Sequence, residues 1–249
     1  MRQYEPKSYG LTHVGMRRDH NEDSILLTDE GGLYIIADGM GGHQFGEVAS
    51  ALAIEAISSK LIESNNGNNP FSLVDAIKEA NNRIFQHSKE QMESQGDTAT
   101  LMAGMGTTVV TLYISRDRDK VLIAHVGDSR AYRLRDSYLE ILTQDHSLAA
   151  LAAANRGVSP IPIRTGFKNI ITRALGIEQD VEVDLREEYI SANDLFLLCS
   201  DGLTNMVSDQ RINEILTSSV SIQSACETLI TEANRNGGKD NISCILVQF

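Results

Sequence analysis

The chain has 249 residues, 41% of them hydrophobic, and a formal net charge of −12 at pH 7. This length and apolar content are enough for a large buried core, and we expect a single domain spanning residues 1–249. The excess of acidic residues argues against nucleic-acid binding, which depends on Lys and Arg side chains that neutralise phosphates.

We expect no membrane-spanning or secretory segment in this sequence. It contains no stretch of about 18 consecutive apolar residues, the length that spans a bilayer, and its N-terminus lacks the apolar region of a secretory signal. Cys199, Cys226 and Cys244 lie in apolar runs without short-spaced pairing, so we interpret them as buried hydrophobic side chains in a reducing compartment. We therefore expect a cytoplasmic protein that does not contact membranes.

In the first half of the chain, one strand-like run precedes two helical patterns. The apolar run 33–37 predicts a buried strand that ends at Asp38. Apolar residues then recur every three or four positions over residues 49–61 and again over residues 73–84, which is the spacing of a buried helix face. The polar stretch 64–70 ends the first of these helices.

In the second half, further runs rich in Val, Ile, Leu and Tyr predict strands over residues 107–114, 120–127, 130–135, 194–200 and 241–249. Turn signals such as SRDRD and GDS lie between neighbouring runs and favour antiparallel pairing. A third helical pattern covers residues 222–233 and ends before Gly237 and Gly238, as helices commonly end at glycine. Helices before and after the strand runs predict an α+β fold in which helices cover sheets.

Residues 148–168, LAALAAANRGVSPIPIRTGFK, form the least regular segment of the sequence. An Ala-rich helical start leads into Gly157, Pro160 and Pro162. Proline removes an amide donor and glycine admits unusual dihedral angles, so the second half should be irregular and lie on the surface. We interpret this segment as a mobile flap.

Carboxylates follow or precede several of the strand-like runs. Asp38 stands directly after an apolar run and before three glycines, where it is either a turn residue or part of a functional site. The other acidic residues at run ends are Glu22, Asp23, Asp128, Asp201 and Asp240. If these groups converge, their repulsion raises their pKa values unless cations compensate. Oxygen ligands suit Mg²⁺, Mn²⁺ or Ca²⁺, but spacing alone does not establish convergence.

Eight short motifs occur in a fixed order along the chain: RRDHNEDS, ADGMGGH, GTTVVTLYI, HVGDSRAY, TQDHSL, ITRALG, LLCSDGLTN and KDNISCILV. As an ordered set they resemble the type 2C metal-dependent Ser/Thr protein phosphatases, the PPM family, in a compact bacterial form. The resemblance covers essentially the whole chain, from about residue 10 to residue 249. It implies a four-layer α-β-β-α sandwich, with two central antiparallel sheets flanked by helix pairs.

The resemblance also implies a set of metal ligands. Asp38 corresponds to the carboxylate that bridges two catalytic metal ions, and the Gly39 carbonyl to a further ligand of one of them. Asp201 and Asp240 correspond to ligands of the second ion. Asp128 corresponds to a ligand of a third, weaker ion that it shares with Asp201.

Three residues of the N-terminal motif have implied roles beside these ligands. Glu22 acts at the first metal through a bound water, and Asp23 supports the loop that carries it. Arg18 matches the arginine that binds the substrate phosphate. Arg17 is the rival for that role, and the register of the motif favours Arg18.

The sequence departs from the family pattern at Met40. Many eukaryotic members have a histidine there, proposed as the general acid for the leaving alcohol, and a thioether cannot donate a proton. Either a metal-bound water or the nearby His43 serves instead. We expect His125 and His146 to be structural.

We therefore expect a cytosolic bacterial phosphatase that uses Mn²⁺ or Mg²⁺ and a metal-activated water to hydrolyse phosphoserine and phosphothreonine in proteins. Its expected partners are phosphorylated proteins and a cognate Ser/Thr kinase, and we expect a monomer. The alternatives are a phosphatase-like module that binds phosphoproteins without turnover and a small-molecule phosphohydrolase. Retention of Asp38, Asp201 and Asp240 argues against a module without activity.

Overall fold

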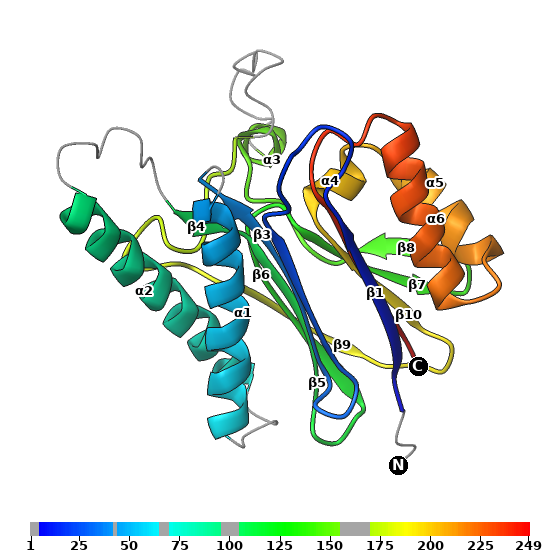
Figure 1. The fold of residues 1–249 in the computed structure, drawn as a ribbon. Helices are drawn as coiled ribbons and strands as arrows, with labels where there is room; N and C mark the ends of the chain where they lie inside the picture. The colour runs from blue at the N-terminus through cyan, green and yellow to red at the C-terminus, as the bar shows by residue number, and fades with distance from the viewer. Residues whose placement is uncertain (1–4, 42–43, 65–69, 96–104, 155–169) are drawn as a thin grey trace.

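Two antiparallel sheets form the central layers of the structure, a computed structural model that describes residues 5–41, 44–64, 70–95, 105–154 and 170–249 (Figure 1). Helices α1 and α2 cover the outer face of one sheet, and helices α5 and α6 cover the outer face of the other (Figure 1). This arrangement confirms the predicted four-layer α-β-β-α sandwich.

The first sheet packs against the two long helices. Its strand order is β2-β3-β5-β6-β9, and β4 pairs with β3. Leu33, Ile35 and Ala37 of β3 face the helices because alternate residues of a strand share one face. The elements are β2 (Asp23–Thr28), β3 (Leu33–Met40), β4 (Gly106–Thr107), β5 (Val109–Ile114), β6 (Lys120–Val126), β9 (Asp184–Tyr189), α1 (Gln44–Ser64) and α2 (Pro70–Gln95).

The second sheet has the strand order β1-β11-β10-β7-β8 and packs against the C-terminal helices. Ser208 and Ser221 begin α5 and α6 as N-caps, and each hydroxyl accepts a hydrogen bond from a backbone amide of the first turn. The elements are β1 (Lys7–His13), β7 (Arg130–Arg135), β8 (Tyr138–Ile141), β10 (Leu195–Cys199), β11 (Ile242–Gln248), α4 (Asp201–Thr204), α5 (Asp209–Ser218) and α6 (Ile222–Arg235).

The layer between the sheets is apolar along most of its length. Tyr34 and Ile36 of β3 point into it and share a buried cluster with Phe196 and Ile245 of the second sheet. Asp38 is two residues beyond Ile36, so its side chain continues the same face of the strand. The alternation of β3 therefore carries a carboxylate to the end of the inter-sheet layer.

Apolar periodicity predicted the central elements correctly. The expected strand over residues 33–37 lies in β3, and the expected helices lie in α1, α2 and α6. Beyond α6, the amide of Gly238 donates to the carbonyl oxygen of Ala233 at 3.1 Å, which is a glycine-dependent helix end as expected.

The sequence patterns missed β1, β2, β8, β9, α4 and α5. The edge strand β9 illustrates the reason. Its sequence, DLREEY, is mostly charged and lacks the run of apolar residues by which strands are recognised. Arg186 lies 2.9 Å from Glu140 of β8, and Glu188 lies 2.6 Å from Arg133 of β7. These ion pairs join the edges of the two sheets and replace the apolar contacts of a central strand.

Two further expectations concern local features. Helix α3 (Leu148–Ala154) begins where the Ala-rich start of the flap was expected, and the rest of that flap, residues 155–168, lies outside the described residues. The three cysteines are buried and form no disulfide, as predicted. Among the residues that the structure describes, no helix is long and apolar enough to cross a membrane.

Asn81 of α2 connects this helix to the loop that precedes β9. Its side chain is 1% exposed, and its amide nitrogen donates to the carbonyl oxygens of Glu178 and Gln179 at 3.0 and 2.9 Å. Its amide oxygen accepts from the backbone amide of Gly176 at 2.8 Å. One buried side chain therefore satisfies three backbone groups of a loop that is distant in sequence.

We expect Asn81→Ala to lower the free energy of unfolding by about 2–4 kcal/mol, because it leaves three backbone groups without their partner. Denaturant unfolding followed by circular dichroism measures this change. Asn82→Ala is the matched control on the exposed side of the same helix and should change stability by less than about 0.5 kcal/mol. Equal effects of the two substitutions would contradict the anchoring role.

Candidate functional site

Acidic residues from both sheets meet at the end of the inter-sheet layer. In the β2–β3 hairpin, Asp23 lies directly opposite Asp38, and the amide of Gly39 donates to the carbonyl oxygen of Glu22 at 3.1 Å. Opposite residues of an antiparallel pair project to the same face. The hairpin therefore places two carboxylates side by side, facing the second sheet.

The second sheet contributes Asp201 and Asp240. Asp201 begins α4 directly after β10, and Asp240 lies just before β11. The adjacent strands pair Cys199 with Cys244, so both aspartates emerge at the same end of the sheet. The Asp201 and Asp38 carboxyl groups lie close enough for the charge of Asp201 to raise the pKa of Asp38. Side chains separated by more than 160 positions thus share one site.

The N-terminal loop completes the site. Arg18 Nη2 lies 2.8 Å from Asp240 Oδ2, and the Arg18 side chain remains 51% exposed. Asn241 holds the loop in place, because its amide nitrogen donates to the carbonyl oxygens of Val14 and His20 at 2.9 Å. Its amide oxygen accepts from the backbone amide of Glu22 at 2.8 Å.

Burial, together with crowding, raises the pKa values of the carboxyl groups. Burial is the largest cause for Asp38, whose pKa lies well above its usual value, and repulsion from Asp23, Asp201 and other aspartates adds to it. Burial and the Asp240 charge raise the pKa of Asp201 to about 6. Like charges held this close in a buried site call for compensating cations.

Two buried carboxylate oxygens have no hydrogen-bond partner among the described residues. Asp23 Oδ2 accepts from the hydroxyls of Ser200 and Ser243 at 2.9 and 2.6 Å, whereas its Oδ1 accepts from none. Asp128 Oδ1 is likewise buried without a partner. Burial raises the pKa of Asp23 and of Asp128 to about 7, with nearby aspartates adding to the shift.

This donor set fits hard divalent cations. Every candidate ligand is an oxygen atom, which suits Mg²⁺ or Mn²⁺ better than zinc. The orphaned oxygens and the raised pKa values both describe a site whose negative charge exceeds what the chain itself neutralises. The residues present therefore fit a cluster of divalent cations.

Glycines allow the close approach of β3 and α1 at the site. A Cβ atom on Gly39 would overlap the carbonyl oxygen of Gly46 and lie 2.6 Å from that of Glu22. A Cβ atom on Gly46 would overlap the Glu22 carboxylate. Only glycine at these two positions lets the helix start beside the carboxylate hairpin.

The remaining predicted residues are the candidates for the leaving-group proton, Met40 and His43, and the two candidates for phosphate binding, Arg17 and Arg18. Met40 is the last residue of β3 and pairs with Gly106, while His43 lies outside the described residues. Arg17 is exposed and has no contact with the acidic cluster in the described structure, whereas Arg18 contacts Asp240. The geometry therefore favours Arg18 over Arg17.

His125 and His146 stack at a centroid distance of 4.7 Å beside Asp184. The Gly127 amide donates to His146 Nδ1 at 3.0 Å, and His125 Nε2 pairs with the Gln144 carbonyl oxygen at 2.9 Å. The three side chains could meet at one cation. However, the Arg173 guanidinium lies 2.7 Å from Asp184 and 3.0 Å from His146, which disfavours a cation there and supports the structural interpretation.

Sequence reasoning did not assign Asp145 or Arg130. Arg130 binds Asp145 through two hydrogen bonds of 2.8 and 2.7 Å, and the Asp145 charge contributes to the raised pKa of Asp128. Asp145 lies in the motif TQDHSL, which supported the family resemblance without giving this residue a role. The motif TQDHSL could therefore have pointed to Asp145, whereas nothing in the sequence indicated that Asp145 binds Arg130.

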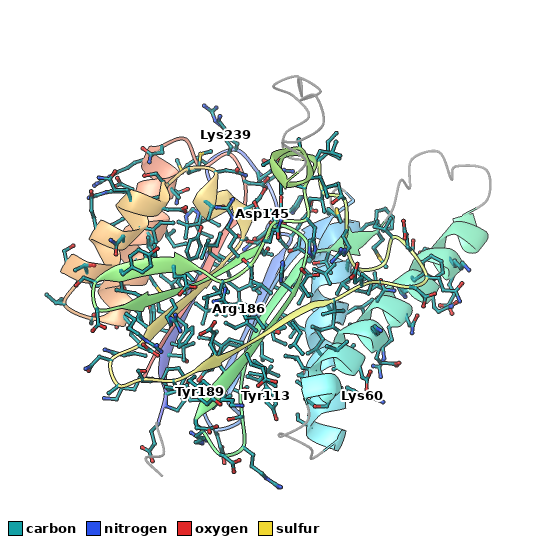
Figure 2. All side chains as sticks on the ribbon, turned by 180° about the vertical axis from the view of Figure 1, so that it is seen from behind. Lys60, Tyr113, Asp145, Arg186, Tyr189 and Lys239 are labelled. Carbon is teal, nitrogen blue, oxygen red and sulfur yellow. The ribbon has the colours of Figure 1, made fainter. Side chains whose placement is uncertain are left out.

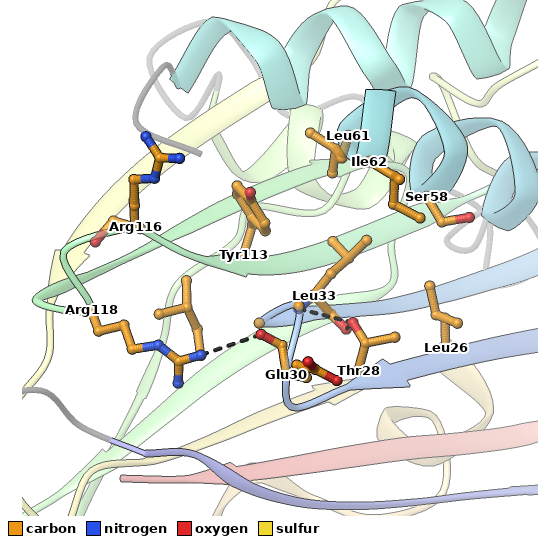
Figure 3. A pocket seen from close by; sticks show the side chains of 14 residues that line it. Leu26, Thr28, Glu30, Leu33, Ser58, Leu61, Ile62, Tyr113, Arg116 and Arg118 are labelled. Atoms are coloured by element: carbon orange, nitrogen blue, oxygen red, sulfur yellow. Dashed lines mark hydrogen bonds between the residues drawn. The ribbon is translucent and has the colours of Figure 1, made fainter. Parts of the chain in front are cut away.

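The carboxylate cluster and one sizeable cavity lie at opposite ends of the sheets. This cavity, of about 710 Å³, is lined by Leu33, Tyr113 and Arg118 at the far end of β3 (Figure 3). A cavity of about 550 Å³ adjoins Met40 and Gly41 instead. Figure 2 shows Asp145 and Lys239 toward the end of the molecule that carries the cluster, and Tyr113 toward the other end.

Comparisons with known proteins give one consistent result. A family model described as "Protein phosphatase 2C" matches residues 12–246. The serine/threonine phosphatase stp of Listeria monocytogenes is 38% identical over 251 residues, covering 95% of this chain and 93% of the relative. The protein phosphatase PhpP of Streptococcus pneumoniae is 32% identical, covering 96% of each chain.

Solved structures agree with these relatives. The serine/threonine phosphatase PstP/Ppp of Mycobacterium tuberculosis superposes with a TM-score of 0.83 at 32% identity, covering 98% of each chain. The catalytic domain of PstP in complex with two manganese ions gives a TM-score of 0.81, also at 32% identity, and covers 98% of this chain and 97% of that chain.

These findings confirm the prediction of a metal-dependent protein-serine/threonine phosphatase that uses Mn²⁺ or Mg²⁺. They agree with the four-layer sandwich described above. The chain belongs to the protein phosphatase 2C family.

Proposed function

We propose that the carboxylate cluster between the ends of the two sheets is the catalytic centre, and that it hydrolyses phosphoserine and phosphothreonine in proteins. The observation that carries this proposal is the convergence of Asp38 of β3 with Asp201 of α4, in a half-buried site with raised pKa values. Under this proposal, residues 1–249 form one catalytic domain.

The proposed ligands follow from position and family membership. Asp38 would bridge two cations, with the Gly39 carbonyl, Asp201 and Asp240 as further ligands. Glu22 would act through a water, with Asp23 beside it. Asp128, together with Asp201, would hold a third ion, for which its unpartnered Oδ1 is available.

Bound Mn²⁺ or Mg²⁺ supplies Lewis acidity toward the phosphoryl oxygens and lowers the pKa of the attacking water. The chain contributes a fixed array of carboxylates, which bound cations would keep ionised and which do not have to reorganise during the reaction. Arg18 projects from the N-terminal loop with its guanidinium held by Asp240, and would bind the phosphate in ground and transition states alike.

Met40 cannot supply the proton for the leaving alcohol, because a thioether has no proton to donate. A water at the centre or His43 would supply it. We further propose that the protein is a cytoplasmic monomer and that a cognate Ser/Thr kinase phosphorylates its substrates.

Removal of either central carboxylate should abolish catalysis. Mutation of outer-shell partners of metal sites typically costs 10–100-fold, so we expect Asp38→Ala and Asp201→Ala each to lower kcat/KM by more than about 100-fold. Hydrolysis of p-nitrophenyl phosphate and of a phosphothreonine peptide with Mn²⁺ measures this loss.

Asp117→Asn, at the exposed β5–β6 turn far from the cluster, is the control for removal of one negative charge. Activity that survives EDTA, or that survives both alanine substitutions, would exclude the proposed centre. Turnover of p-nitrophenyl phosphate without turnover of any phosphopeptide would favour a small-molecule phosphohydrolase. Peptide binding without hydrolysis of either compound would favour a binding module.

Arg18→Ala should mainly raise KM, because the arginine would bind the phosphate equally before and during reaction. Loss of its hydrogen bond to Asp240 should also weaken activation by Mn²⁺. Steady-state kinetics at saturating Mn²⁺ separate the two effects. Arg17→Ala is the matched control and should leave both constants within about twofold. A large loss of kcat with unchanged KM would contradict this role.

Metal should stabilise the protein more at high pH than at low pH. The Asp23 and Asp128 carboxyls have a pKa of about 7 in the folded protein without metal, against about 3.9 in an unfolded chain. The folded state then binds more protons between about pH 4 and pH 7, so its free energy of unfolding falls as pH rises through this range.

Cations should reverse this loss, because they bind the ionised carboxylates. At pH 8 and Mn²⁺ about 100-fold above its Kd, we expect a Tm about 5–10 °C above that in EDTA. The difference should shrink toward pH 5. Differential scanning fluorimetry measures it, and Asp38→Asn should reduce it at pH 8. A Tm difference that is independent of pH would contradict competition between metal ions and protons for the same carboxylates.

A further inference from the structure

A cavity of about 550 Å³ opens beside the proposed catalytic centre. The last residues of β3 form one side of it, and the segment 171–182 forms the other. Its apolar lining is made by Met40, Gly41, Ile171, Ala174, Ile177 and Val181. Because Met40 is two residues beyond Asp38, this lining begins about 7 Å along the strand from the central carboxylate.

Backbone hydrogen bonds connect the cavity wall to the centre. Thr107 of β4 pairs with Gly39, and its hydroxyl donates to the carbonyl oxygen of Asp38 at 2.9 Å. Thr107 also exchanges two backbone hydrogen bonds with Leu175, at 3.1 and 2.9 Å. The carboxylate strand and the segment 171–182 are thus held in one ladder.

The far side of the segment is fixed as well. Asn81 holds the carbonyl oxygens of Glu178 and Gln179 and the amide of Gly176, as described above. Gly176 has φ = +85°, and a Cβ atom there would overlap Ile84. The segment therefore lies tightly against α2, and its side chains are presented from a rigid support.

The charged residues of the cavity are mostly acidic. Arg173 is neutralised by Glu182 at 3.0 Å and Asp184 at 2.7 Å. Glu178 and Asp180 also line the cavity, and neither forms an ion pair within the described part of the chain. An apolar lining with two carboxylates that form no ion pair with any described residue is complementary to a long cationic side chain.

We propose that this cavity binds a Lys or Arg side chain of the phosphorylated protein, close in sequence to the phosphoserine or phosphothreonine. This inference rests on the proposed catalytic function of the neighbouring cluster. The aliphatic stem of the substrate side chain lies over Met40 and Ile177, and its cationic head lies near Glu178 and Asp180. An extended peptide rises about 3.3 Å per residue, so the cation is two to four residues from the phosphorylated one.

The cavity therefore adds a preference to the reaction and does no chemistry of its own. Exposed ion pairs contribute little, but an ion pair that combines with burial of an aliphatic stem contributes more. Substrates that carry an acidic residue at the same position meet like charge there and should be disfavoured.

The test uses phosphothreonine peptides with Ala at all flanking positions and a single Arg placed at successive positions on either side. For the full-length protein with Mn²⁺ at low salt, we expect one Arg position to raise kcat/KM about five- to tenfold over the all-Ala peptide. The gain should fall as salt is raised, since screening weakens a partly exposed ion pair. Glu at that position should give a lower kcat/KM than Ala.

The ratio of kcat/KM for the Arg and Ala peptides should fall to about twofold or less in Glu178→Gln/Asp180→Asn. The control is Glu55→Gln/Asp117→Asn, which removes the same two charges from exposed positions on α1 and the β5–β6 turn. It should keep the preference of the unaltered protein. Equal rates for all peptides, or a preference that survives loss of Glu178 and Asp180, would overturn the proposal.

Failure of the catalytic proposal would appear differently. In that case neither p-nitrophenyl phosphate nor any peptide would be hydrolysed with Mn²⁺. Fluorescence anisotropy with labelled Arg and Ala peptides would then test the cavity by itself. Tighter binding of the Arg peptide, lost in Glu178→Gln/Asp180→Asn, would support the cavity, and equal affinities would exclude it.

Discussion

Repulsion between carboxylates at the end of the inter-sheet layer is the constraint on which this structure depends. The apolar packing of Tyr34 and Ile36 against Phe196 fixes the distance between the sheets. It also fixes where Asp38 and Asp201 meet, because Asp38 lies near the end of β3 and Asp201 lies two residues beyond the end of β10, and both strands belong to that packed layer. Apolar burial thus supplies the free energy that holds like charges together until cations neutralise them.

Neutral polar side chains hold the carboxylates in place without neutralising their charge. Ser200 and Ser243 satisfy one oxygen of Asp23, and Asn241 holds the backbone of the loop that carries Arg18 and Glu22. Because these groups carry no charge, they orient the carboxylates while leaving their negative potential intact. The orphaned oxygen of Asp23 remains available for water or a cation at the centre.

Local sequence predicted the elements whose stability comes from apolar burial. β10 is a continuous apolar run, β3 and β11 each contain one, and α6 has a clear buried stripe, so both signals are strong. β9 was missed because ion pairs with the other sheet stabilise it. The candidate carboxylates were found through ordered motifs, since spacing alone did not show that they converge. The Asn81 contacts join positions about 95 residues apart, and no local pattern encodes them.

The division of the centre between two sheets has a mechanical consequence. Asp38 belongs to β3 of one sheet, and Asp201 begins α4 just after β10 of the other. If both bind a cation, as proposed, that cation would cross-link layers that are distant in the chain. Any shear of one sheet over the other would separate the proposed ligands, so the free energy of metal binding would oppose that shear. Substitutions that loosen the packing of the sandwich should therefore weaken metal binding, even where the substituted residue is far from any ligand.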